Sequence, residues 1–205
     1  MTTERFNKMA ADYDKKTRRR QLAESISTAI ARLPLSKTMS AMEFGCGTGL
    51  VGLLLAPKLG KLTALDTSLG MLDVLQQKIG EQHLDNVQCL HADIFQENFN
   101  ERYDLIICSM TLHHLHDTNA LLQRFAELLN PGGYLAIADL YPEDGSFHDA
   151  SAEGIFHTGF QIDRLQSILT EFGMESIQSE HVHTITKAKT GNDYPVFLLT
   201  ACRQS

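Results

Sequence analysis

Hydrophobic and polar positions along the chain follow a helical period in some stretches and form short strand-like runs in others. Leu22, Ile26, Ile30 and Leu33 recur at helical spacing before Pro34, which is typical of a helix that buries one face. Apolar runs predict strands at 39–44, 61–66, 86–93, 103–110 and 134–140. The segments between them predict helices at 50–57, 68–79 and 119–129. This alternation predicts an α/β fold.

The pattern changes after Leu140. Residues 141–160 are polar and have no clear period, so we expect an irregular excursion there. An amphipathic helix is expected at 162–173, followed by one strand at 174–186 and a second at 193–203. The two strands flank a turn signal at Thr190–Asp193, which predicts a hairpin, and the "NPGG" stretch at 130–133 predicts another turn. No repeat, low-complexity tract or linker interrupts the chain, so we expect one domain over 1–205.

Composition narrows the possible partners. The chain has 205 residues, 43% of them apolar, with 18 basic and 25 acidic side chains and a net charge of −7. This balance argues against a general nucleic-acid or anionic-membrane surface, and the basic run at 15–20 is interpreted as a solvated helix start. We see no signal peptide and no apolar stretch that could cross a bilayer, and we therefore expect a cytoplasmic protein without a membrane span. The four cysteines show no C-x-x-C spacing, so no disulfide framework or zinc site is expected.

The stretch "EFGCGTGL" at 43–50 follows a predicted strand and opens a helix. Gly45, Gly47 and Gly49 give it a G-x-G-x-G spacing, and such glycines let backbone pass close to a ligand at a helix N-terminus. A dinucleotide fingerprint would be G-x-G-x-x-G, but Leu50 stands at the place of its third glycine. That spacing disfavours a nicotinamide cofactor, although Gly52 nearby keeps this alternative open.

Two aspartates follow the next two predicted strands. Asp66 ends the second strand, where a carboxylate can accept both hydroxyls of an unphosphorylated ribose. Nicotinamide and adenosyl cofactors both offer that diol. Asp93 follows the third strand and could receive an adenine amino group, or it could be an ordinary turn acid. The two residues indicate a nucleoside site without identifying the cofactor.

Taken together, five motifs resemble those of the class I S-adenosylmethionine-dependent methyltransferases. They are "MEFGCGTG", "ALDTSLGML", "CLHADIF", "YDLIICSMTLHHL" and "LLNPGGYLAIADL", in the family's order and spacing over residues 39–140. The resemblance implies a Rossmann-like, doubly wound sheet of seven strands in the order 3-2-1-4-5-7-6, with strand 7 antiparallel. The hairpin predicted above fits that arrangement independently.

The resemblance also implies positions around the methionine end of the cofactor. Gly45 and Gly47 would border the methionine moiety, with Glu43 nearby, and Ser109 would lie near the sulfonium. The segment "FNKMAADYD" resembles the start of methyltransferases of the quinone-biosynthesis type, where it folds over the cofactor. Tyr13 is therefore a candidate lid residue, with an ordinary helix aromatic as the alternative. The implied organisation is a helical lid at 1–36, a cofactor-binding core at 37–140 and a substrate-side part at 141–205.

At the nucleoside end, the resemblance places the cofactor against five residues. Asp66 would hold the ribose, Thr67 and Met71 would flank the adenine, and Asp93 with Ile94 would meet its edge.

Histidines after the fourth strand are the candidate catalytic residues. His113 and His114 in "TLHHLHD" would lie at the cofactor face, where a base assists if the acceptor carries a proton, although a structural role is the favoured alternative. The same run with His91 could suggest a metal cluster, but adjacent histidines point in different directions and we expect no metal. His148 and His157, in the excursion, are placed to shape substrate choice.

The sequence thus predicts methyl transfer from S-adenosyl-L-methionine to an unidentified small-molecule or lipid-like acceptor, with S-adenosyl-L-homocysteine as product. DNA is not an expected partner, and the oligomeric state cannot be read from the sequence. The alternatives are an NAD(P)-dependent oxidoreductase and a non-catalytic protein that binds S-adenosylmethionine.

Overall fold

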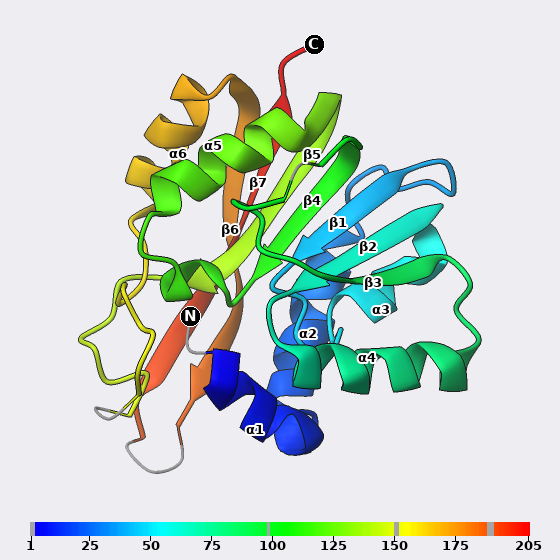
Figure 1. Cartoon of the computed structure of the whole chain (residues 1–205). Coiled ribbons are helices and arrows are strands. Elements are labelled where there is room, and N and C mark those ends of the chain that lie inside the picture. Colours follow the sequence, from blue (N-terminus) through cyan, green and yellow to red (C-terminus); the bar gives the residue numbers. More distant parts are fainter. Residues whose placement is uncertain (1–2, 98, 150–151, 188–190) are drawn as a thin grey trace.

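The computed structural model describes residues 3–97, 99–149, 152–187 and 191–205, and it contains one seven-stranded sheet in the order β3-β2-β1-β4-β5-β7-β6 (Figure 1). The strands are β1 Ser40–Phe44, β2 Lys61–Asp66, β3 Val87–His91, β4 Tyr103–Ser109, β5 Leu129–Leu140, β6 Met174–Thr186 and β7 Asp193–Arg203. Strands β1 to β5 pair in parallel, and β7 runs antiparallel to both of its neighbours. The predicted fold class and strand order are confirmed.

Helices cover both faces of the sheet. They are α1 Thr3–Tyr13, α2 Thr17–Ile30, α3 Gly52–Leu55, α4 Leu69–Gln82, α5 Thr118–Leu128 and α6 Ile162–Glu171, with short 3-10 helices η1 Ala56–Lys58 and η2 Leu112–His114. Helices α5 and α6 lie in front of the sheet in Figure 1 and α2 lies behind it. Among the residues that the structure describes, no helix is both long enough and apolar enough to span a membrane.

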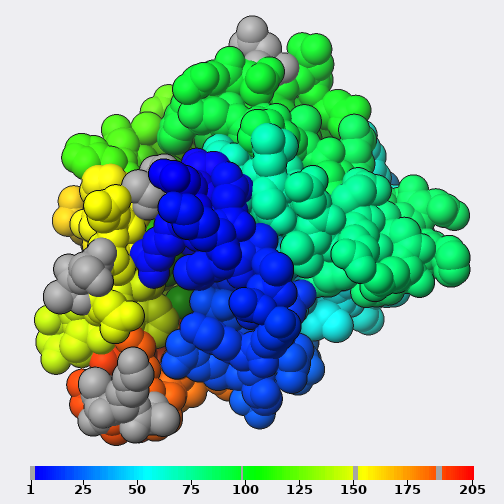
Figure 2. All heavy atoms as spheres, turned by 60° about the horizontal axis from the view of Figure 1, so that its bottom comes forward, coloured from blue at the N-terminus to red at the C-terminus, as the bar shows by residue number. Residues whose placement is uncertain are grey.

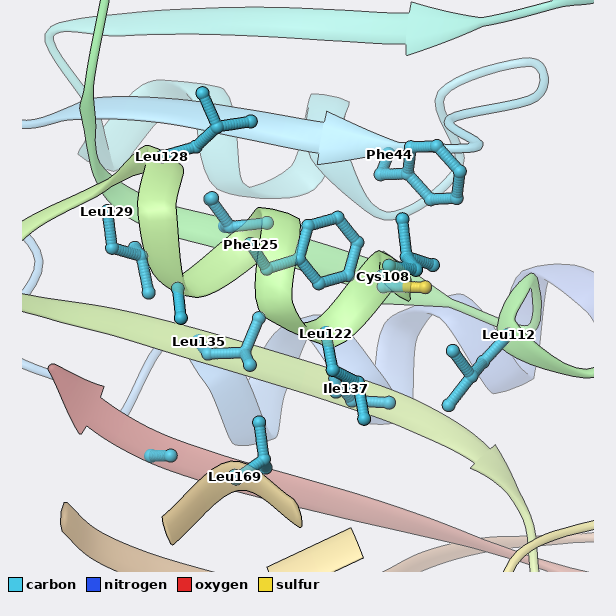
Figure 3. Packing of buried hydrophobic residues seen from close by; sticks show 14 of the residues in the cluster. Phe44, Cys108, Leu112, Leu122, Phe125, Leu128, Leu129, Leu135, Ile137 and Leu169 are labelled. Atoms are coloured by element: carbon cyan, nitrogen blue, oxygen red, sulfur yellow. The ribbon is translucent and has the colours of Figure 1, made fainter. Parts of the chain in front are cut away.

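The core has a separate layer on each face of the sheet. On one face, Phe125 of α5 is fully buried and meets Phe44 at the end of β1 edge to face, with ring centroids 5.5 Å apart (Figure 3). On the other face, Ile26 and Ile30 of α2 pack in one cluster with Leu62 of β2. Because both faces of the sheet are covered, β4 is a nearly continuous apolar run in the centre of the sheet.

Some predicted elements differ from the observed ones. The helix expected at 50–57 is only the four-residue α3 followed by η1, which contains Pro57. The "NPGG" stretch lies inside β5, where Gly132 has a φ of 75° and the register with β4 shifts. The hairpin of β6 and β7 is confirmed, although Thr190 in its turn lies outside the described residues. As predicted, the described part of 141–160 contains no helix or strand.

Helix α1 lies across the carboxyl ends of the central strands. Figure 2 shows the N-terminal residues, in blue, between the yellow atoms of the 141–160 region and the teal atoms of α4. Asn7 Oδ1 accepts hydrogen bonds from Ser68 Oγ at 2.7 Å and from the N–H of Gly70 at 2.9 Å. After α1, Asp14 forms an ion pair of 2.8 Å with Lys78. The N-terminal segment is therefore fixed to α4 at the edge of the glycine loop.

Candidate active site

A cavity lies between the carboxyl ends of the sheet and helices α1 and α2. It lies beyond the carboxyl ends of β1 and β4, the neighbouring strands between which the strand order of the sheet reverses. This is the usual ligand position in a doubly wound sheet. Eight of the residues predicted from the sequence line it: Tyr13, Glu43, Gly45, Gly47, Asp66, Met71, Ser109 and His114. Residues from separate predicted motifs thus converge on one site.

The three glycines after β1 serve different purposes. All have positive φ, at 64° for Gly45, 53° for Gly47 and 77° for Gly49. A Cβ on Gly45 would lie 2.3 Å from the Thr111 side chain, and one on Gly49 would lie 2.4 Å from Leu75. A Cβ on Gly47 would meet nothing within 4 Å. Gly45 and Gly49 are therefore required by packing within the protein, whereas Gly47 borders open space in the cavity.

Asp66, at the end of β2, is held by the same loop. Its carboxylate accepts hydrogen bonds from the N–H of Gly47 and from the N–H of Ser68, both at 2.8 Å. Burial raises the pKa of Asp66, and these backbone donors oppose the shift. A carboxylate offers about four lone-pair positions, so Asp66 keeps acceptor capacity toward the cavity.

Glu43 is a second carboxyl group in the cavity, and it is 3% exposed. Within the described residues its Oε2 has no hydrogen-bond partner. Burial raises the pKa of Glu43 to about 8; the backbone N–H of Gly52 opposes this shift, and the nearby negative charge of Asp66 adds to it. A Cβ on Gly52 would lie 2.2 Å from Oε2, so the missing side chain at Gly52 leaves room for this carboxyl group.

The N-terminal helices supply the opposite wall. Arg19 stacks over the Tyr13 ring, 3.7 Å from its centroid, and donates a hydrogen bond of 3.0 Å to the Tyr13 carbonyl. Burial raises the pKa of Tyr13, so its hydroxyl stays protonated near neutral pH. Phe6 of α1 contacts His114 edge to face at 5.3 Å. The sequence did not predict Arg19, because only the fold shows that it stacks on Tyr13.

Four predicted site residues do not line this cavity. The Asp93 carboxylate accepts from the N–H of Phe95 at 3.0 Å and from Gln96 Nε2 at 2.9 Å, which are contacts of a turn acid. Ile94 is buried in the core, and Thr67 lies beside Asp66 without reaching the cavity. Their contacts with adenine stay predictions.

His113 is the fourth predicted site residue that lies outside the first cavity. It lines a second cavity together with His114 and His148. Its Nδ1 lies 2.7 Å from the carboxylate of Asp139, a buried residue near the end of β5. His114 Nδ1 lies 2.7 Å from the Gly154 carbonyl. Sequence reasoning missed Asp139, although an acidic residue inside the apolar run "YLAIADL" was a signal for it. His91 does not join these histidines, because its Nε2 lies 3.1 Å from the carbonyl of Thr67.

The fold and this cavity define a class I S-adenosylmethionine-dependent methyltransferase. The chain belongs to the methyltransferase-domain family, whose model matches residues 15–189. The family and the cofactor predicted from the sequence are thereby confirmed.

Individual proteins agree with this assignment. The chain is 30% identical over 158 residues to the uncharacterized methyltransferase C1347.09 of Schizosaccharomyces pombe, covering 70% of this chain and 55% of that protein. It is 31% identical over 138 residues to a malonyl-[acyl-carrier protein] O-methyltransferase of Priestia megaterium, covering 64% and 48%. It thus spans about half the length of these curated relatives. The solved DhpI–SAH complex shares the fold, with a TM-score of 0.76, 22% identity and coverage of 99% and 95%.

Proposed function

We propose that this chain transfers the methyl group of S-adenosylmethionine to a small-molecule acceptor and releases S-adenosylhomocysteine. The observation that carries the proposal is the cavity over the glycine loop. Two carboxyl groups, the buried one of Glu43 and the half-buried one of Asp66, line it together with Gly47, beside which the space is open.

The residues present suit the two polar ends of the cofactor. Asp66 would accept hydrogen bonds from the ribose hydroxyls with its remaining lone pairs. Glu43 Oε2, unpartnered within the described residues, would accept from the positively charged amino group of the methionine moiety. A cation there favours the ionised carboxylate and offsets the cost of its burial. Met71, 1% exposed, would form an apolar wall for the adenine.

When bound, the cofactor supplies an activated methyl group on a sulfonium, which is itself a good leaving group. The chain's own contribution is to align the acceptor and to exclude water. Phe6 and Tyr13 of α1 line the cavity and would cover the bound cofactor on that side.

The second cavity is the proposed acceptor site, because it shares a wall with the first. Phe6, Tyr13, Met110 and His114 are among the residues that line both. His113, which lines only the second cavity, would accordingly contact the acceptor, and His114 would lie on the wall between acceptor and cofactor.

The rim of this second cavity favours an anionic acceptor. Within the described residues, its lining has a single acidic side chain, Asp149, and five basic ones: Arg5, Lys16, Arg18, Arg19 and Lys187. The whole chain carries a net charge of −7, so this concentration of positive charge is local. A carboxylate or phosphate group on the acceptor fits that electrostatic environment.

Calorimetry with S-adenosylhomocysteine tests the cofactor site. Asp66→Ala removes a charged hydrogen-bond acceptor, and the loss of about 1.5–3 kcal/mol corresponds to an affinity about 10- to 100-fold weaker. Asp73→Ala is the matched control, since Asp73 is exposed on α4, and should bind as the wild type does. Equal affinities for both variants would refute the ribose role of Asp66.

A methyl-transfer screen tests the acceptor site separately. We expect turnover of acceptors that carry a carboxylate or phosphate group and little turnover of neutral analogues. Turnover of neutral acceptors alone would contradict the acceptor class but leave the cofactor site intact. Tight S-adenosylhomocysteine binding without turnover of any class would favour a non-catalytic binding protein.

A further inference from the structure

Three histidine side chains from two distant segments meet at the wall of the second cavity. His113 and His114 lie in η2 after β4, and His148 lies in the loop after β5. Within the described residues, these three form the group whose potential metal-binding atoms all lie within 4.8 Å of one another. His113 Nε2 and His148 Nε2 are 3.1 Å apart. Such convergence leaves several nitrogen lone pairs facing a small common space.

The hydrogen bonds of two of these rings determine which nitrogen is free. The Asp139 carboxylate accepts from the backbone N–H groups of Leu140 and His113, so His113 Nδ1 donates to it as well. His114 Nδ1 lies next to the Gly154 carbonyl, which can only accept, so this nitrogen also carries a proton. A neutral imidazole has one N–H, and therefore both Nε2 atoms present lone pairs.

This is the arrangement that metal-binding histidines use. A ligating imidazole commonly donates its other N–H to a carboxylate or a backbone carbonyl, which fixes the ring and increases its basicity. Nitrogens bound to tetrahedral zinc at about 2.0–2.1 Å are separated by roughly 3.3 Å, close to the His113–His148 distance.

We propose that His113, His114 and His148 bind one divalent transition-metal ion of the zinc class, with Asp139 as the positioning residue behind His113. Three protein ligands leave a coordination position open, as in catalytic zinc sites. All three histidines line the second cavity, so the open position faces the proposed acceptor site. An anionic or hydroxyl oxygen of the acceptor is the ligand that would complete the coordination. This assignment replaces the expectation of no metal, and it makes His113 and His114 ligands rather than bases.

Zinc titration of the 205-residue chain, stripped of metal with a chelator, tests the site. We expect one equivalent of Zn²⁺ by calorimetry and binding at least 100-fold weaker in His148→Ala. Asp139→Asn should weaken binding about 10- to 100-fold, since it alters only the partner of a ligand. His116→Ala is the matched control: His116 is adjacent in sequence but exposed and outside the cluster, and this variant should bind as the wild type does.

Two further measurements, of Co²⁺ absorption and of S-adenosylhomocysteine affinity, show whether a variant has lost metal binding alone. Co²⁺ added to the stripped wild type should give visible absorption bands of a low-coordinate nitrogen site, and His148→Gln, which preserves a polar side chain, should abolish them. S-adenosylhomocysteine affinity should be unchanged in all variants, which separates this site from the proposed cofactor site. Absence of saturable Zn²⁺ binding to the wild type, or unchanged binding in the folded His148→Ala or His148→Gln protein, would overturn the proposal.

Discussion

Burial of Glu43 disfavours its ionised carboxylate, whereas binding of a cationic ligand would favour it. Its carboxyl group is fully enclosed, one oxygen has no partner within the described residues, and its pKa is raised to about 8. A buried polar group without a partner lowers the stability of the folded chain. Its place beside Gly47 and Asp66 in the cavity agrees with the proposal that it binds the positively charged amino group of the cofactor.

Stability should therefore depend on the ionisation of Glu43. The folded state holds a proton up to about pH 8, whereas the unfolded chain releases it near pH 4.5. The unfolding free energy of the wild type should then fall as pH rises from about 4.5 to 8, by at most about 1.4 kcal/mol per pH unit, and this contribution should level off above 8. Urea unfolding of the wild type and Glu43→Gln at pH 5, 6, 7 and 8 measures the difference.

The Glu43→Gln protein should lack this slope and become the more stable of the two as pH rises. Differences between the two proteins cancel the contributions of other titrating groups. Parallel curves for both proteins over this range would show that Glu43 is ionised in the folded state.

At the residue scale, the sequence predicted which residues would converge on the cavity where the signal was local, and their roles in binding stay predictions. Gly47, Asp66 and Met71 belong to short motifs at strand ends, and the fold brings strand ends together. The partnership of His113 with Asp139 joins positions 26 residues apart, and the contact with His148 depends on an irregular loop. No periodic pattern encodes the path of such a loop, so the sequence could not predict the cluster.

At the scale of elements, helix α1 depends on α4 for its position. Only Ala10 of α1 is fully buried, so apolar packing alone holds the helix weakly. The hydrogen bonds that Asn7 accepts from Ser68 and Gly70 fix α1 to the start of α4. The close approach at Gly70, where a Cβ would lie 3.0 Å from the Asn7 backbone, fits the same contact.

Asn7→Ala should loosen this contact and weaken cofactor binding. The two lost hydrogen bonds contribute about 1 kcal/mol each, so we expect S-adenosylhomocysteine affinity to fall by up to roughly 30-fold. Amide hydrogen exchange in α1 should become faster at the same time. Calorimetry and exchange measurements on Lys8→Ala serve as the control, because Lys8 is exposed and forms its ion pair with the exposed Glu4 on the same helix. Unchanged affinity with faster exchange would show that α1 does not contribute to the cofactor site.

The bounds of helices and strands with a clear hydrophobic period were predicted closely. The bounds of elements that contain or follow glycine and proline were not. Strand β2 has the predicted bounds, Lys61–Asp66, and α4 begins at Leu69 after the Ser68 cap, whose Oγ accepts from the N–H of Met71. The helix expected at 50–57 is cut short because its first turn enters from the glycine loop and Pro57 lacks a backbone donor. Apolar composition alone does not determine helix length.

At the scale of the whole molecule, the core and the cavity meet at the end of β1. Phe44, 3% exposed, packs against Phe125 on the α5 side, and the glycine loop begins at the next residue. Phe125 itself does not line the cavity. Global stability and the shape of the site can therefore be separated by a substitution at Phe125.

Phe125→Ala should lower the unfolding free energy by about 3–5 kcal/mol, because it removes a fully buried ring and leaves a cavity. S-adenosylhomocysteine binds only the folded chain, so at 100 times its Kd it should restore about 2.7 kcal/mol in both the variant and the wild type. Thermal unfolding with and without the ligand measures both quantities. Phe156→Ala is the control, since that ring is 48% exposed, and its stability should change little. If S-adenosylhomocysteine stabilises the wild type but not Phe125→Ala, packing between Phe125 and Phe44 of β1 also determines the shape of the glycine loop.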